Sequence, residues 1–119
     1  MTTSLQEGPV ILIGYEYRLQ LQAEAALFPE GASFAGQVRG AISAATMVAE
    51  VSSAAGSVLR VDGRTLEIVL PPDLTASLAP GGIVLDLVRT DLTPDRHLGF
   101  VLEIAVVLPV TRLPVSGGL

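Results

Sequence analysis

The stretch that decides the fold is Leu66-Glu67-Ile68-Val69-Leu70-Pro71-Pro72-Asp73-Leu74-Thr75-Ala76-Ser77-Leu78-Ala79-Pro80-Gly81-Gly82-Ile83-Val84-Leu85-Asp86-Leu87. It begins and ends with apolar segments of strand length, and the prolines between them forbid one continuous strand. Asp73 can cap a single helical turn that ends near Leu78, and a Pro-Gly-Gly break precedes the second strand. The stretch therefore predicts the crossover that carries a chain from one sheet of a β-sandwich to the other.

Upstream of this stretch, the dominant period along the chain is two. Residues 15–22 alternate between apolar side chains, beginning with Tyr15 and Tyr17, and polar ones, which predicts a half-buried strand. A turn at 29–31 precedes a second predicted strand over 32–39. Gly36 lies inside that strand, and a glycine there indicates a bulge or a close neighbour.

The remaining segments also read as short strands. Residues 44–51 form a predicted strand, with a helix over 41–55 as the alternative because alanine and methionine favour helices, and 52–57 reads as a loop. Asp62-Gly63 between 58–61 and 65–70 is a strong hairpin signal, since both turn positions accept positive φ. Residues 83–90 and 98–108 form a second antiparallel pair around a turn at 91–96.

Together these segments predict an all-β protein, an antiparallel two-sheet β-sandwich of the immunoglobulin-like or jelly-roll-like kind. We expect seven or eight strands and one short helical turn. The 119 residues suffice for one domain, which we place at 10–112. Residues 1–9 form an expected N-terminal arm, and 113–119 an expected C-terminal tail.

The amino-acid composition argues against several classes of binding partner. The net charge is −5, with 12 acidic residues, 7 arginines and no lysine, so no basic stripe is available for nucleic acid. The apolar stretch 98–110 is broken by Glu103 and Pro109 and is too short to span a membrane, and the first residues lack the features of a secretory signal. Cysteine is absent, so no disulfide or thiolate metal site is expected.

Charged residues make up only 16% of the chain, which is low for the surface of a small domain. Either part of the surface is buried against partners, or the alanine-rich composition, with arginine in place of lysine, reflects a GC-rich genome. The segment 98–108 favours the first explanation because both its faces are apolar. Phe100, Leu102, Ile104, Val106 and Leu108 can fill the core, which leaves an outward stripe as the candidate interface: Val101, Glu103, Ala105 and Val107.

No constellation of residues predicts catalysis, a cofactor or a metal. His97 is the single histidine and reads as a surface residue at the start of a strand. Asp91, Thr93 and Asp95 have calcium-loop spacing without the rest of that motif, so they read as a turn. Asp86 and Glu103 could suggest a glycosidase pair, but alternation predicts solvent-facing positions for both. We therefore expect a non-enzymatic protein without a cofactor.

The order of elements resembles that of small β-sandwich proteins of tailed phages, similar in pattern to the amino-terminal domain of siphophage baseplate upper proteins. The resemblance spans about residues 10–112 and is carried by the segments Tyr15-Glu16-Tyr17-Arg18-Leu19-Gln20-Leu21, Gly31-Ala32-Ser33-Phe34-Ala35-Gly36-Gln37-Val38-Arg39, Leu66-Glu67-Ile68-Val69-Leu70, Leu74-Thr75-Ala76-Ser77-Leu78, Pro80-Gly81-Gly82-Ile83-Val84-Leu85-Asp86-Leu87 and Val110-Thr111-Arg112. The chain departs from the pattern at Ile13-Gly14, where a charged or aromatic residue usually opens the first strand, and in its longer alanine-rich segment 41–55.

This resemblance implies a structural protein of the virion, assembled in the host cytoplasm. A freestanding sandwich is more typical of a capsid decoration or cement protein, which would associate with itself, most plausibly as a trimer, and with the major capsid protein. The alternatives are a tail or baseplate accessory or adaptor protein, which would bind tail proteins, and a host-surface carbohydrate-binding module. With only five aromatic residues in the chain, the carbohydrate alternative is the weaker of the two.

Overall fold

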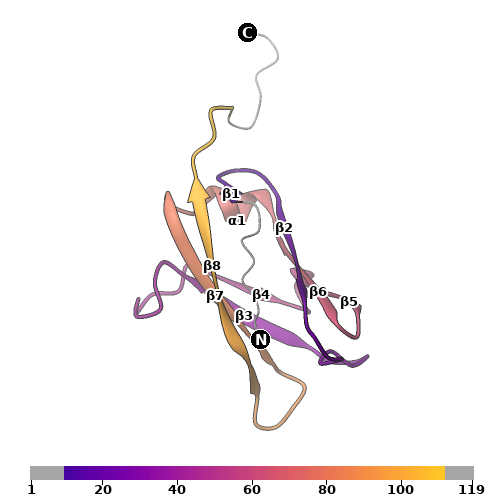
Figure 1. Ribbon diagram of the computed structural model, residues 1–119. Coiled ribbons are helices and arrows are strands. Elements are labelled where there is room, and N and C mark those ends of the chain that lie inside the picture. The colour runs from indigo at the N-terminus through magenta and orange to yellow at the C-terminus, as the bar shows by residue number, and fades with distance from the viewer. Residues whose placement is uncertain (1–9, 112–119) are drawn as a thin grey trace.

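A computed structural model describes residues 10–111 and contains, within that range, eight strands and one short helix (Figure 1). The elements are β1 (Ile11–Leu12), β2 (Tyr17–Gln22), β3 (Phe34–Arg39), β4 (Ala49–Ser52), β5 (Val58–Asp62), β6 (Thr65–Leu70), α1 (Pro72–Ala76), β7 (Gly81–Arg89) and β8 (Arg96–Val107). The expected all-β architecture with two sheets and one helical turn is confirmed. The predicted arm 1–9, the tail 113–119 and Arg112 lie outside the described residues.

The strands form a five-stranded sheet, in the order β1-β8-β7-β3-β4, and a three-stranded sheet, in the order β2-β6-β5. Helix α1 connects β6 of the smaller sheet to β7 of the larger one, so the predicted crossover is confirmed. One pair departs from the antiparallel expectation, because β1 runs parallel to the end of β8, with Ile11 opposite Val106. A hydrophobic pattern can predict the pairing of strands that follow each other in the sequence. It could not predict this contact, because β1 and the end of β8 are more than 90 residues apart.

Strand β2 follows the alternation in the sequence. Tyr17 and Leu19 are buried and Arg18 is exposed, and six residues of β2 pair in register with β6. Tyr15 was expected on the same apolar face, but it lies before the strand. Its hydroxyl donates a hydrogen bond of 2.6 Å to the carbonyl of Thr111, so it links the two ends of the described chain.

The hairpin β5–β6 is confirmed, but its turn lies one residue later than predicted. Asp62 is still in β5, opposite Thr65, and Gly63 and Arg64 form the turn. Gly63 is not among the glycines with positive φ, so it does not adopt the predicted left-handed conformation. The register shifts between Arg60 and Asp62, and this irregularity moves the turn.

The alanine-rich segment contains no helix. Strand β4 is shorter than expected and pairs with β3, with Ala49 opposite Val38, while residues 40–48 form a loop. The helical alternative is therefore wrong, because cross-strand pairing outweighs the local helix propensity of alanine. Figure 1 shows this loop projecting from the five-stranded sheet on the side away from the three-stranded sheet.

The core contains aliphatic side chains from both sheets and two aromatic rings in edge-to-face contact, Phe28 and Phe34, with centroids 5.7 Å apart. Its fully buried members include Ile11, Val38, Val51, Val58, Leu66, Ile68, Leu70, Leu85 and Leu87. Most of these residues come from the predicted apolar face of a strand. Hydrophobic periodicity therefore specifies which side of each sheet faces inward.

Helix α1 is held in place by a side chain that its sequence pattern did not single out. Asp73 was expected to cap it, but Pro71 occupies the N-cap position and no side chain caps the helix. Thr75 is fully buried instead, and its hydroxyl accepts a hydrogen bond from the amide of Gly14 (3.1 Å) and donates to the carbonyl of Tyr15 (2.8 Å). These bonds fix the turn between β1 and β2 against the crossover. Helix α1 has five residues and is the one helix within residues 10–111. It is far too short to cross a membrane.

Replacing Tyr17 by phenylalanine should stabilise the protein. The Tyr17 hydroxyl is buried without a hydrogen-bond partner in the described residues, and burial raises the pKa of this phenol. Removing an unpaired buried polar group recovers its desolvation cost, so we expect the free energy of unfolding to rise by about 1 kcal/mol. Urea denaturation measures this change. A loss of about 1 kcal/mol or more would mean that the hydroxyl has a partner in solution.

Candidate interaction surface

The four predicted interface residues lie on one side of β8. Val101, Glu103, Ala105 and Val107 are exposed, whereas the residues between them, Leu102, Ile104 and Val106, are buried. The predicted alternation is therefore present, and Val101 and Val107 each expose more than two fifths of their surface, 44% and 42%.

Two of the expected core residues of this segment behave differently. Phe100 is only partly buried, and Leu108, 48% exposed, is not in the core. Leu108 follows the last residue of β8, so strand alternation no longer determines which way its side chain points.

Strand register extends this stripe across the sheet. Val84 of β7 lies opposite both Arg39 of β3 and Glu103 of β8, so these three residues form one row. A second row contains Glu50 of β4, Gln37, Asp86 and Val101, and at the other edge Leu12 of β1 lies opposite Val107. We call these residues the outer face: Leu12, Gln37, Arg39, Glu50, Val84, Asp86, Val101, Glu103, Ala105 and Val107.

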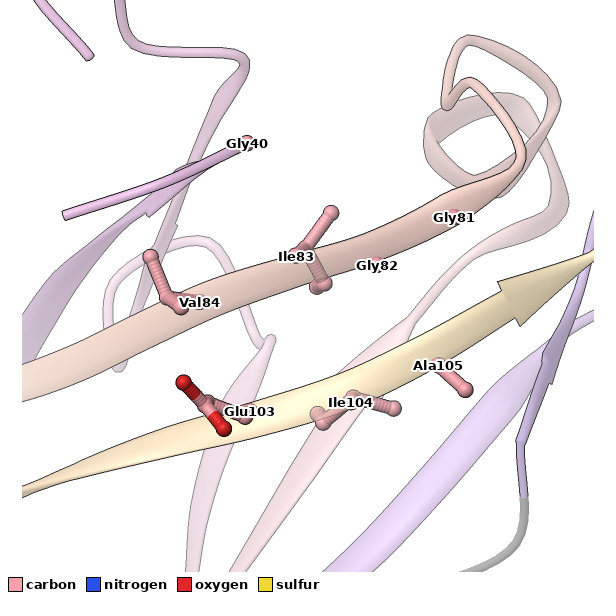
Figure 2. Close-up of a pocket in the computed structure, with 8 residues that line it drawn as sticks. All are labelled: Gly40, Gly81, Gly82, Ile83, Val84, Glu103, Ile104 and Ala105. Carbon is pink, nitrogen blue, oxygen red and sulfur yellow. The ribbon is translucent and has the colours of Figure 1, made fainter. Parts of the chain in front are cut away.

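Two shallow hollows open on the outer face. The first, of about 320 Å³, lies where β7 begins with Gly81 and Gly82 beside Ala105 of β8 (Figure 2). It exists because Gly82 has no side chain there. Glu103 is the one charged residue that lines it, and Figure 2 shows its carboxylate beside Val84 on the neighbouring strand. Glycines and apolar side chains therefore line this hollow around a single carboxylate.

The second hollow, of about 150 Å³, is bordered by Ile42 from loop 40–48 together with Gln37, Arg39 and Val101. Ile42 is 71% exposed, so this loop places a large apolar side chain at the margin of the outer face. The sequence did not indicate this role, because most of the segment was predicted as a strand over 44–51, or as a helix over 41–55, and not as an exposed loop.

The opposite surface, on the three-stranded sheet, carries both polar and apolar side chains. Arg18 of β2 forms ion pairs with Glu16 (2.7 Å) and with Glu67 of β6 (3.1 Å), and Gln20 lies opposite Glu67. Leu59 and Val61 of β5 are exposed by 39% and 50%. The paired charges therefore lie over β2 and β6, and the exposed apolar side chains of this sheet lie on β5.

His97 is more than an isolated surface residue. Its Nε2 lies 2.8 Å from the Asp86 carboxylate, and the amide of Gly99 donates to its Nδ1 at 2.8 Å. Because Nδ1 accepts this hydrogen bond, the proton of the neutral ring is on Nε2 and points to Asp86. No nucleophilic hydroxyl bonds to this pair in residues 10–111, so its visible role is to fix the start of β8 against β7.

The two carboxylates considered as a glycosidase pair lie on the same face of neighbouring strands, diagonally across adjacent rows. Asp86 lies opposite Val101 and is bonded to His97, whereas Glu103 lies opposite Val84 in another row. Both side chains are on the solvent side of the sheet, as alternation predicted.

The loop with calcium-like spacing is organised by an ion pair. Asp91 accepts a hydrogen bond of 2.6 Å from Arg89 and one of 3.2 Å from the amide of Ser33. Thr93 and Asp95 do not join it in a cluster, and the described residues contain no group of three or more side chains suited to a metal ion. The segment is a turn in this structure.

The Asp91 ion pair makes a testable contribution to acid stability. The hydrogen bond from Arg89 lowers the pKa of Asp91 from 3.8 to about 2. A carboxyl whose pKa is depressed by folding stabilises the protein above its unfolded pKa, and the contribution is lost as the pH falls through the folded value. The melting temperature of wild type should therefore exceed that of Asp91→Asn at pH 6, and the two should converge by about pH 2. A difference that is independent of pH would contradict this assignment.

Comparison of the chain with protein-family models, with curated proteins and with solved structures gave no match in any of the three. The resemblance to phage proteins thus remains a prediction from the residues quoted above.

Proposed function

We propose that the protein is a non-enzymatic structural component of a tailed-phage virion. Its most favoured role is that of a capsid decoration or cement protein that associates with itself and binds the shell through the outer face. The observation that carries this proposal is the exposed apolar stripe of β8, continued by Leu12 and Val84, on a small domain with few charges. Large exposed apolar surfaces mark interaction sites in soluble proteins.

The architecture supports the same proposal. Two sheets joined by a crossover are compatible with the jelly-roll-like or immunoglobulin-like sandwich expected from the sequence, and jelly rolls recur in viral shells. Since one fold hosts many functions, this support is secondary to the surface itself.

A role in the tail or baseplate is the second candidate, because the outer face would serve equally to dock on a tail protein. The genes beside the one for this chain separate the two possibilities. A neighbouring major capsid gene supports decoration, and a neighbouring tail-tip gene supports the baseplate.

The carbohydrate-binding alternative loses support from the positions of the aromatic side chains. Tyr17, Phe28 and Phe34 are buried in the core, and Phe100 is partly buried against it. The hydroxyl of Tyr15 is engaged by Thr111. Carbohydrate-binding sites commonly stack sugars on exposed aromatic rings, and none of the aromatic side chains in residues 10–111 is free to form such a site.

Placing a charge on the outer face should weaken shell binding and leave the fold intact. We expect Val107→Asp to reduce co-sedimentation with empty shells, assembled from the major capsid protein of the same genome, by about tenfold or more in affinity. Val107 is exposed, so the monomer should retain its circular dichroism spectrum and melting temperature.

Leu59→Asp is the matched control, because Leu59 is similarly exposed (39%) on β5 of the other sheet. It should bind like wild type. Equal binding by both variants, or no binding of wild type to shells or to tails, would speak against the proposed function.

A further inference from the structure

Two charged groups on the outer face, Arg39 and Glu103, form no ion pair within residues 10–111, whereas Arg18 and Arg89 each do. The Arg39 guanidinium donates instead to the carbonyl of Ala44 (3.0 Å) and to the side chain of Gln37 (2.6 Å). These two charges flank Val84 in one row, with Arg39 on one side and Glu103 on the other.

From this arrangement we infer that the outer faces of two copies of the chain pack against each other about a two-fold axis that runs parallel to β7 over Val84. In this pair, which rests on the proposed self-association, the axis places Arg39 of each copy opposite Glu103 of the other. The two Val84 side chains meet between these ion pairs.

The charges select this orientation. A two-fold axis perpendicular to the strands would place Arg39 against Arg39 and Glu103 against Glu103, and like charges in contact are unfavourable. Stacked sheets lie about 10 Å apart, a gap that an arginine and a glutamate side chain together can bridge. The parallel axis also brings the two Asp86 carboxylates toward each other, so one like-charge contact accompanies the two ion pairs, whereas the perpendicular axis gives like-charge contacts and no ion pair.

The position of loop 40–48 is compatible with the same two-fold pair. It projects on the side of the outer face (Figure 1), and its exposed Ile42 lines the second hollow together with Val101. In the two-fold arrangement each loop lies against β8 of the other copy. Ile42 thereby covers apolar surface that one copy alone leaves in water.

The small area of contact between the two copies predicts that they associate weakly in dilute solution. Nine residues of β7 and the width of three strands give a contact of roughly 30 Å by 14 Å, or about 400 Å² per copy. A standard interface buries about 800 Å² per partner. We therefore expect a dissociation constant in the micromolar range or above, with shell binding raising the effective concentration. A two-fold pair also replaces the trimer expected from the sequence.

Charge reversal tests the pairing. Sedimentation equilibrium from about 10 μM to about 1 mM should show that wild type dimerises. Arg39→Glu and Glu103→Arg should each weaken dimerisation by about tenfold or more, and the double variant should restore it to within about threefold. Failure of the double variant to recover would overturn the two-fold pair, as would a wild type that stays monomeric or forms trimers.

Because Arg39→Glu also removes the bonds to Ala44 and Gln37, a second measurement avoids that change. The natural chain has no cysteine, so Val84→Cys introduces a single thiol at the axis. A short bismaleimide should cross-link this variant into dimers, and should not cross-link Leu59→Cys, on the other sheet. Equal cross-linking of the two would overturn the inference. Some variants could lose self-association and still bind shells. That result would show that the two-fold pair is not needed for shell binding, and it would leave the proposed function unaffected.

Discussion

Replacing Gly36 by alanine is expected to lower the free energy of unfolding by about 3 kcal/mol, the largest effect that we predict for a single methyl group. Gly36 lies in β3, between β4 and β7, opposite Leu87 on one side. A Cβ atom built on it overlaps the carbonyl oxygen of Asp86 and lies 2.9 Å from a methyl group of Leu87. A backbone atom in a central strand cannot move aside cheaply, so β3 and β7 would have to separate locally.

Gly40→Ala is the control for this result. Gly40 follows the end of β3, its φ is not positive, and no atom lies within 4 Å of a Cβ built there. Alanine at this position should change the stability by less than about 0.5 kcal/mol. Urea denaturation of both variants gives the comparison, and equal stabilities would show that β3 and β7 are not as close as the structure has them.

Thr75→Val is expected to cost about 2 kcal/mol, although valine has nearly the same shape as threonine. The substitution removes the hydroxyl that bonds Gly14 and Tyr15 and takes this partner from a partly buried amide and a partly buried carbonyl. It should also loosen the turn between β1 and β2. Hydrogen exchange should therefore accelerate at Gly14.

Thr75→Ser keeps the hydroxyl and loses only a methyl group, so it should retain most of the stability and the slow exchange of the Gly14 amide. If serine and valine destabilise equally, packing at this site matters and the hydrogen bonds do not.

Local patterns in the sequence were sufficient to predict most strands. The alternation in 17–22 and 101–107 identified both the strands and their buried sides, and Gly36 was correctly linked to a close neighbour. The turn at 62–64 was displaced because a bulge in β5 changes the register, and no residue pattern reports a bulge of that kind. The parallel contact of β1 could not be predicted either, since it depends on the final positions of the two chain ends.

The candidate surface was only partly predictable for the same reason. The outward stripe of β8 follows from two apolar faces on one strand. Arg39 and Val84 join it through sheet order, which places β3 beside β7 although more than 40 residues separate them in the chain. The Asp86–His97 contact likewise requires the hairpin register.

The proposed contacts would also account for the valine and alanine side chains that the outer face leaves exposed. Exposed apolar strands promote aggregation when no partner covers them. Burial against a second copy and against a shell would cover this area while the polar surface of β2 and β6 stays in solvent.

Quantitative mass spectrometry of purified virions tests whether the protein is built into a particle. Particles produced from the genome that encodes the chain should be purified by density-gradient centrifugation and washed with salt. We expect the chain to remain with the particles in many copies, in a fixed ratio to the major capsid protein or to a tail protein. Its absence from washed particles, while it is abundant in the lysate that produced them, would contradict the proposed function.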